Sequence, residues 1–140
     1  MTDAEGQEEL YTTENAPVAD LPVAVLIDEG TASSAEILAA AVVESGQGTT
    51  IGVTTFGTGT VLNAFDLSDG SMIYLGTGLW STASGQVVWK VGLEPQFMVE
   101  LESPRDRLRP RDGGSPSPSD LLWSDDTQLQ AAIDWLAEGA

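Results

Sequence analysis

The chain has 140 residues, enough for one domain with a buried core, and 41% of them are hydrophobic, which excludes a chain that is disordered throughout. Its net charge of −17, from 22 acidic and 5 basic residues, repels nucleic-acid phosphates and anionic membrane surfaces, so we expect no nucleic-acid partner. The absence of cysteine and histidine excludes disulfides, ordinary zinc sites and histidine-based acid–base catalysis, so a nucleophile must be Ser or Thr, with Lys or a carboxylate as its base.

The first half of the chain predicts a strand, a helix and a second strand. Residues 1–20 are polar and acidic, which is typical of loop or edge structure. Residues 21–28 (LPVAVLID) form a short apolar run that predicts a buried strand. Residues 35–43 are apolar almost all round and predict a buried helix, ended by the glycines that follow. Residues 49–56 (TTIGVTTF) predict the second strand.

A hairpin and two short strands are expected next. Residues 60–67 (TVLNAFDL) and 71–80 (SMIYLGTGLW) flank the turn signal Asp69-Gly70, so they predict a β-hairpin. Residues 85–92 (GQVVWKVG) and 96–101 (QFMVEL) each predict a further short strand.

The C-terminal part predicts a linker followed by a helix. Residues 103–119 are rich in Arg, Pro and Ser and read as a linker or surface loop, whose four arginines form either a basic contact patch or a solvated stretch. A helical spacing of apolar residues follows, with Asp125 and Asp126 at its start: Leu129, Ala132, Ile133 and Leu136. We therefore expect an α/β core over 1–102, the linker over 103–119, and a C-terminal helix over 120–140 packed on the core.

Ser33 is the first candidate for chemistry. It lies in DEGTASSAEIL (28–38), where a predicted strand leads through glycine into a helix start. A side chain at such a tip is exposed, and main-chain amides nearby can hold an oxyanion. Ser33 and Glu36 also form the pattern S-x-x-E of a capping box, in which Ser33 only caps the helix. The two roles are compatible, and both stay open.

The order of motifs along the chain resembles the C-terminal processing, or tail-specific, serine peptidases. In that family a β-strand precedes G-S/T-A-S-A-S/A-E-I-L, followed by a helix, a T-F-G-K-G-x-V-Q stretch and a hairpin. The similar blocks occur here in the same order: GTASSAEIL (30–38), TFGTGTVL (55–62), LSDGSMIYL (67–75), TASG (82–85) and VGLEP (91–95). The ending DDTQLQAAIDWL (125–136) also resembles the family's final helix, so the resemblance covers about residues 8–137. Their common order makes the resemblance specific, although no single block would.

The resemblance implies an α/β fold of the ClpP/crotonase-like kind and a Ser–Lys dyad. The family's nucleophile falls on Ser33, and its oxyanion donors fall on the amides around Gly30 and Ser34. The family's lysine base falls on Thr58, and the glutamine that orients it falls on Leu62. The chain corresponds to a partial domain without the family's N-terminal half and PDZ domain.

The change at Thr58 removes the expected base. A desolvated lysine takes the serine proton near neutral pH, whereas threonine can hydrogen-bond Ser33 but cannot hold its proton. Substitutes are few: Lys90 is the only lysine and reads as an exposed strand residue, while Asp28, Glu29 and Glu36 are near Ser33 in sequence. Glu36 is conceivable as a base, although capping is the more ordinary role.

Other motifs indicate no cofactor or metal. The acidic turn at 66–70 lacks calcium-loop spacing, and the two GTG stretches (57–59 and 76–78) lack the residues of a phosphate loop. Three tryptophans could line a groove or pack in the core: Trp80, Trp89 and Trp123.

Three functions are compatible with this sequence. The first is a catalytically degenerate peptidase domain that binds an extended peptide or an unfolded protein C-terminus. The second is an active serine endopeptidase completed by another segment or chain, and the third is a non-enzymatic small-ligand module of the same fold. A partial domain leaves apolar surface that a second copy or the N-terminal half would cover.

The compartment stays open. No apolar run reaches the ~18 residues of a membrane helix, so we expect no membrane span. The family is usually exported, but the acidic stretch MTDAEGQEEL is unlike a secretory signal.

Overall fold

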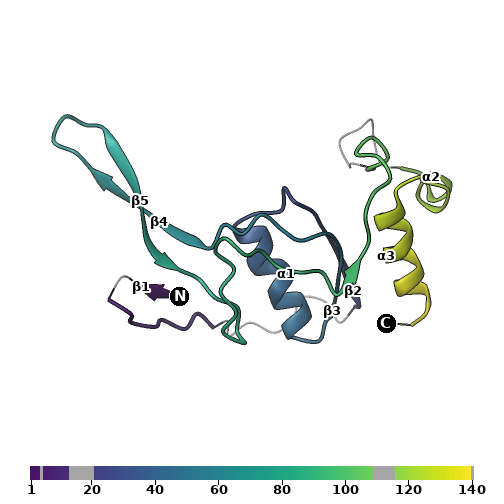
Figure 1. Cartoon of the computed structure of the whole chain (residues 1–140), viewed down its shortest axis with the longest axis horizontal. Helices are drawn as coiled ribbons and strands as arrows, with labels where there is room; N and C mark the ends of the chain where they lie inside the picture. The colour runs from purple at the N-terminus through teal and green to yellow at the C-terminus, as the bar shows by residue number, and fades with distance from the viewer. Residues whose placement is uncertain (4, 13–20, 109–115, 140) are drawn as a thin grey trace.

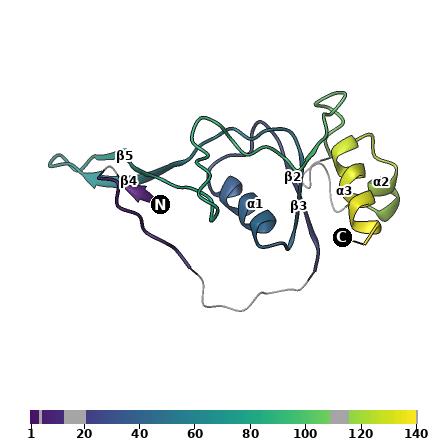
Figure 2. The same ribbon diagram turned by 60° about the horizontal axis from the view of Figure 1, so that its bottom comes forward.

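A computed structural model describes residues 1–3, 5–12, 21–108 and 116–139. It consists of a layered α/β core from which a long hairpin projects (Figure 1). The core sheet is parallel, with strand order β2-β3-β6: β2 (Val23–Ile27), β3 (Gly48–Gly52) and β6 (Phe97–Met98). Helix α1 (Ser34–Glu44) covers one face of β2 and β3, and α3 (Thr127–Ala137) covers the other, so the core has three layers (Figure 2).

The core lies between α1 and the sheet because both faces there are apolar. Ile27 of β2 is 1% exposed and belongs to the cluster on this face, whereas Ile51 of β3, also 1% exposed, lies outside that cluster. Ala39 and Ala40 let α1 approach the sheet closely, and the cluster is completed by Trp80, Val88 and Leu93 from the segments after the hairpin. Burial of apolar area is the main stabilising term of such a cluster.

The hairpin consists of β4 (Thr60–Asp66) and β5 (Met72–Leu79), with the two-residue strand β1 (Thr2–Asp3) paired to β5. All pairings in this second sheet are antiparallel, and its order is β1-β5-β4. The turn places Gly70 at φ 84°, the left-handed region that glycine adopts easily. The pairing register shifts between Val61 and Leu62, as at a β-bulge.

The acidic stretch 66–70 is the hairpin turn that the sequence predicts. Asp69 accepts hydrogen bonds from the amide and the hydroxyl of Ser71, at 2.9 and 2.6 Å. The Ser71 hydroxyl and then its amide hold the pKa of the Asp69 carboxyl below its usual value. The turn acid is thus occupied by local bonds.

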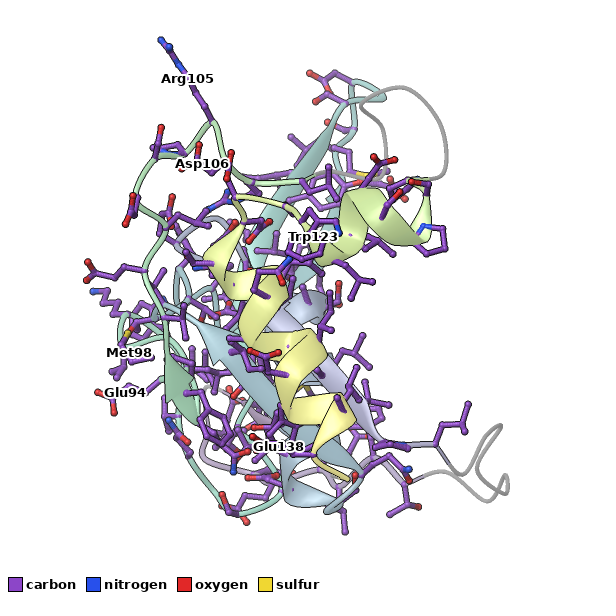
Figure 3. The ribbon with its side chains drawn as sticks, turned by 90° about the vertical axis from the view of Figure 1, so that its right-hand side faces the viewer. Glu94, Met98, Arg105, Asp106, Trp123 and Glu138 are labelled. Atoms are coloured by element: carbon purple, nitrogen blue, oxygen red, sulfur yellow. The ribbon has the colours of Figure 1, made fainter. Side chains whose placement is uncertain are left out.

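Helix α3 is fixed by buried polar contacts at its start. Asp126 is its N-cap, 2% exposed, and accepts hydrogen bonds from the amides of Leu129 and Leu108, each at 2.9 Å. The buried side chain of Gln128 donates to the carbonyl of Val99 at 2.9 Å. Figure 3 looks onto α3 with the sheet behind it.

Most predicted elements are confirmed, with four corrections. The strand, helix, hairpin and terminal helix expected at 21–28, 35–43, 60–80 and 125–140 correspond to β2, α1, β4–β5 and α3. The second strand ends at Gly52, and residues 53–59 leave the sheet as a loop. The strand predicted at 85–92 is wrong, because this segment folds into turns in which Val91 N and Gly92 N both donate to Val88 O.

The remaining two corrections concern the C-terminal part. Of the strand predicted at 96–101, only β6 forms. The stretch predicted as a linker contains the start of a short helix, α2 (Pro118–Leu122), capped by Ser117. Residues 109–115 of that stretch lie outside the described residues. None of the helices described is long and apolar enough to cross a membrane.

Candidate functional site

Ser33 lies where β2 has ended and α1 begins. Its side chain is exposed, and its backbone has φ 55° and ψ −123°. Among the described residues, the only other non-glycine residue with positive φ is Lys90. A serine held in this region is strained, and such strain persists only where the surroundings over-determine it.

Glu36 supplies many of the contacts that hold the Ser33 backbone in this conformation. It is fully buried, and its Oε2 accepts hydrogen bonds from the amides of Ser33, at 2.8 Å, and Thr58, at 2.9 Å. Its Oε1 accepts from the amide of Gly57 at 2.8 Å and from the hydroxyl of Thr55. One carboxylate oxygen therefore joins two residues that are far apart in sequence, and Ser33 and Thr58 lie next to each other.

The capping box predicted for Ser33 and Glu36 is confirmed. The Glu36 side chain accepts a hydrogen bond from the Ser33 amide at 2.8 Å, and the Ser33 side chain faces the Glu36 amide in return. Glu36 does more than cap, since both its oxygens also accept donors from residues 55–58. A carboxylate engaged in this way serves as a structural acceptor and is poorly placed to take the Ser33 proton.

The loop that carries Thr58 is packed tightly against residues 88–92. The Thr58 carbonyl accepts a hydrogen bond from the Trp80 indole at 3.2 Å, and the Gly57 carbonyl accepts one from the amide of Lys90 at 2.9 Å. Leu62 follows on β4, just after the register shift, and its side chain is 60% exposed. The two positions that would carry the lysine and the glutamine thus hold side chains without a base.

The other candidate bases are engaged elsewhere. Lys90 lies beside the loop through its main chain, but its Nζ stands 4.3 Å from the centre of the Trp89 ring, a cation–π contact. Asp28 and Glu29 face Arg107, whose guanidinium lies 2.6 Å from Asp28 Oδ2 and 3.9 Å from Glu29 Oε2. Lys90 near the loop and Arg107 near Asp28 are both placements that local sequence patterns do not reveal.

The two oxyanion candidates differ in their surroundings. The Gly30 amide donates to Asp28 Oδ1 at 2.9 Å, so it is already occupied. Ser34 is the first residue of α1, where main-chain amides have no partner within the helix. Of the two, the Ser34 amide is better suited to receive a developing negative charge.

The tryptophans and arginines singled out in the sequence lie in different environments. Trp80 belongs to the core, whereas Trp123 is 85% exposed at the end of α2. The ring of Trp89 contacts the Lys90 amine. Arg107 makes specific contacts, and Arg105 is exposed and points away from the core (Figure 3). Arg109 and Arg111 lie outside the described residues. Within the described part of the chain, no group of acidic residues could hold a metal ion.

Gly57 allows a direct test of the loop packing. It has φ 87°, and a Cβ on it would lie 2.8 Å from the Gly92 amide nitrogen. Gly70, at φ 84° with open space around it, has the same backbone strain without the clash. We expect Gly70→Ala to lower the free energy of unfolding by about 1–2 kcal/mol and Gly57→Ala by about 1–3 kcal/mol more, measured by urea unfolding. Equal losses would contradict the tight packing at Gly57.

Comparison with known proteins identifies the family of this chain. Residues 1–99 match the family model described as Peptidase family S41. The chain belongs to peptidase family S41. The carboxy-terminal processing protease CtpA of Bacillus subtilis is 44% identical over 96 residues, which are 69% of this chain and 21% of that protein. The carboxyl-terminal-processing protease of Synechocystis is 33% identical over 135 residues, which are 96% of this chain and 29% of that protein.

Solved structures confirm the S41 fold class expected from the resemblance, a mixed α/β domain. The photosystem II D1 C-terminal processing protease matches 58% of this chain and 21% of its own, with a TM-score of 0.54 and 37% identity. A lipoprotein from Streptococcus agalactiae matches 99% of this chain and 43% of its own, with a TM-score of 0.70 at 22% identity, which is a likeness of fold alone. This S41 chain spans less than a third of the length of the two relatives above.

Proposed function

We propose that this chain carries the nucleophile-bearing part of a C-terminal processing peptidase site, with Ser33 at the nucleophile position, and that it binds an extended peptide with little or no hydrolysis. The observation that carries the proposal is the shared contact at Glu36 Oε2, which accepts from the amides of both Ser33 and Thr58. The position of the nucleophile and the position of the missing base are held side by side by one buried group. The framework for a dyad is present, and the basic side chain is not.

The strained backbone of Ser33 supports the nucleophile role. An exposed hydroxyl at a strand-to-helix junction is accessible to a carbonyl group, and the Ser34 amide at the start of α1 is suited to hold the oxyanion. Residues in sparsely populated backbone regions cluster at functional sites. Capping alone does not require this conformation, since an N-cap residue ordinarily has β-region dihedrals.

Apolar side chains around the site support peptide binding. Phe56 is 69% exposed next to Gly57, and Leu62 is 60% exposed on β4. Ile37 and Leu38 are 46% and 62% exposed in the first turns of α1. These exposed apolar groups, close to Ser33 and Thr58 along the chain, offer contacts to alternate side chains of an extended peptide, whose main chain can pair with a strand edge.

The lack of a base argues against efficient hydrolysis. General base catalysis is worth roughly 10²–10⁴-fold, and a nucleophile and its base act as a unit. The Lys90 amine lies over Trp89, and the nearby carboxylates are bound to amides or to Arg107. A pocket lined by Glu29, Arg107 and Gln128 among others, of about 230 Å³, is smaller than ordinary ligand sites and does not favour a small-ligand module.

Two measurements on the wild-type chain and Ser33→Ala test this proposal. Fluorescence anisotropy with a labelled, unstructured peptide bearing a free apolar C-terminus should show saturable binding by both chains. Incubation with a serine-directed fluorophosphonate should label the wild-type chain slowly and Ser33→Ala not at all. Peptide cleavage that disappears in Ser33→Ala would refute the degenerate assignment. Absence of saturable binding by both chains would refute the peptide-binding role.

A further inference from the structure

The turn before Ser33 is organised by Asp28. Its Oδ1 accepts hydrogen bonds from the amide of Gly30, at 2.9 Å, and the hydroxyl of Thr31, at 3.1 Å. The Asp28 amide donates to the Thr31 hydroxyl oxygen at 2.9 Å, and the Thr31 amide donates to the Asp28 carbonyl at 2.9 Å. These four contacts fix residues 28–31 as one closed turn, which leads directly to Ser33.

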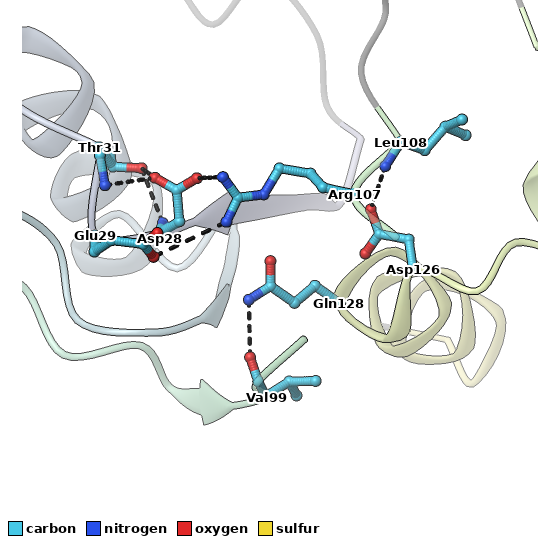
Figure 4. A network of polar contacts seen from close by, with 9 residues as sticks. Asp28, Glu29, Thr31, Val99, Arg107, Leu108, Asp126 and Gln128 are labelled. Atoms are coloured by element: carbon cyan, nitrogen blue, oxygen red, sulfur yellow. Dashed lines mark hydrogen bonds and ion pairs between the residues drawn. The ribbon is translucent and has the colours of Figure 1, made fainter. Parts of the chain in front are cut away.

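Asp28 is in turn held by an arginine from a distant segment. Arg107 Nη1 lies 2.6 Å from Asp28 Oδ2, and the two side chains are only 21% and 23% exposed. The Nη2 atom of Arg107 lies 3.9 Å from Glu29 Oε2, so one guanidinium faces both acids of the turn (Figure 4). Exposed ion pairs contribute little to folding stability. This pair is partly buried, and the planar guanidinium favours a fixed geometry toward the carboxylates.

Arg107 is itself anchored to the opposite layer of the core. The next residue, Leu108, donates its amide to Asp126 Oδ2 at 2.9 Å, and Asp126 is the buried N-cap of α3. The segment of Arg107 and Leu108 therefore connects the start of α3, through the Leu108 amide, with the turn that precedes Ser33, through the Arg107 guanidinium. Arg105, two residues earlier, is exposed and faces solvent.

The turn also contacts the loop that carries Thr58. The Thr31 carbonyl accepts a hydrogen bond from the Phe56 amide at 2.9 Å. Glu36 fixes Ser33 from the helix side, and the Asp28 turn fixes it from the strand side. The strained backbone of Ser33 needs constraints on both sides, because a chain held on one side alone would relax to an ordinary conformation.

We propose that Arg107 is a positioning residue of the site: through Asp28 it holds the turn that sets the backbone of Ser33 and the spacing of the Thr58 loop. This inference rests on the proposed function only in taking Ser33 as the nucleophile position. The stretch predicted as a linker then contributes Arg107 to the support of the site, although its composition indicates only a surface loop.

Hydrogen exchange of the whole chain, compared between Arg107→Gln and Arg105→Gln, tests the role without any ligand. Both variants remove one positive charge from the same segment. We expect amides of residues 28–33 to exchange about tenfold faster in Arg107→Gln, as for loss of one charge-assisted hydrogen bond, and to be unchanged in Arg105→Gln. Arg107→Lys should recover part of the protection, because an ammonium can reach Asp28 but cannot face both acids as a planar fork.

Asp28→Asn extends the test from the other partner. It keeps the Oδ1 acceptor for Gly30 and loses the charge that Arg107 contacts, so it should reproduce the Arg107→Gln pattern, and the double variant should add little. Exchange at 28–33 that is equal in Arg107→Gln and Arg105→Gln would overturn the proposal. If Arg107→Gln unfolds globally, unchanged exchange at 28–33 in Asp28→Asn would overturn it.

Fluorophosphonate labelling links the turn to the site. If Ser33 is the nucleophile position, its labelling rate should fall about tenfold in Arg107→Gln and stay at the wild-type value in Arg105→Gln. A local rise in exchange with unchanged labelling would refute the positioning role at Ser33. A wild-type chain that neither labels nor binds peptide would refute the proposed function, and the exchange comparison would still decide whether Arg107 holds the turn.

Discussion

Replacing Thr58 by lysine together with Leu62 by glutamine should raise the fluorophosphonate labelling rate of Ser33 by about 10²–10⁴-fold, the usual contribution of a general base. Thr58 is adjacent to Ser33 because both amides contact Glu36 Oε2, so a lysine there starts from the right part of the site. Leu62 lies just after the register shift in the pairing of β4 with β5. Labelling should rise with pH as the new amine loses its proton. The rate is measured over pH 6–10 with the folded state checked by circular dichroism.

Two controls separate base catalysis from other effects of the double substitution. Thr58→Met with Leu62→Gln has similar bulk and no basic group, so its labelling should stay near the wild-type rate. Ser33→Ala added to the lysine variant should abolish labelling. A folded lysine variant without a gain in rate would show that Thr58 is not in the base position.

Substitution of Glu36 by alanine should lower the free energy of unfolding by roughly 3–5 kcal/mol, a large part of the stability of a domain of this size. The side chain is fully buried and accepts four hydrogen bonds. Its removal leaves two buried donors (Thr55 and Gly57) and two partly buried ones (Ser33 and Thr58) without this acceptor and opens a cavity between α1 and the Thr58 loop. Urea unfolding followed by circular dichroism measures the loss.

The isosteric variant Glu36→Gln refines this result. It keeps one oxygen but turns an amide donor toward other donors, so we expect a smaller loss of about 1–3 kcal/mol. Glu94→Gln changes the same charge at an exposed position and should alter stability by no more than about 0.5 kcal/mol. A loss at Glu36→Ala no larger than that at Glu94→Gln would mean that the carboxylate does not organise the site.

Together these variants distinguish the framework of the site from its chemistry. Glu36 and the Asp28 turn hold Ser33 and the Thr58 loop by main-chain contacts, which do not depend on the side chain at position 58. Threonine at position 58 supplies no base and leaves these contacts in place. This is why we expect a gain in reactivity from two substitutions without redesign of the backbone.

Local sequence patterns determined the elements whose signals lie within a few residues. The apolar run before Asp28 gave β2, the apolar periods gave α1 and α3, and Asp69-Gly70 gave the hairpin turn. The same applies to the part of the capping box in which Glu36 reaches the Ser33 amide. These features form because helix, strand and turn preferences depend on near neighbours.

The tertiary structure alone decided the contacts between distant segments. The pattern S-x-x-E does not reveal that Glu36 also binds residues 55–58, and a segment rich in arginine and proline does not reveal that Arg107 holds Asp28. Residues 85–92 have strand-like composition, but the tight turn at Val88 and the packing against Gly57 override that preference. Local sequence thus determined Ser33 as a candidate, and the resemblance to the family singled out Thr58, whose side chain is not basic. Which groups hold the two together depends on long-range hydrogen bonds and on burial, and these arise only when the layers pack.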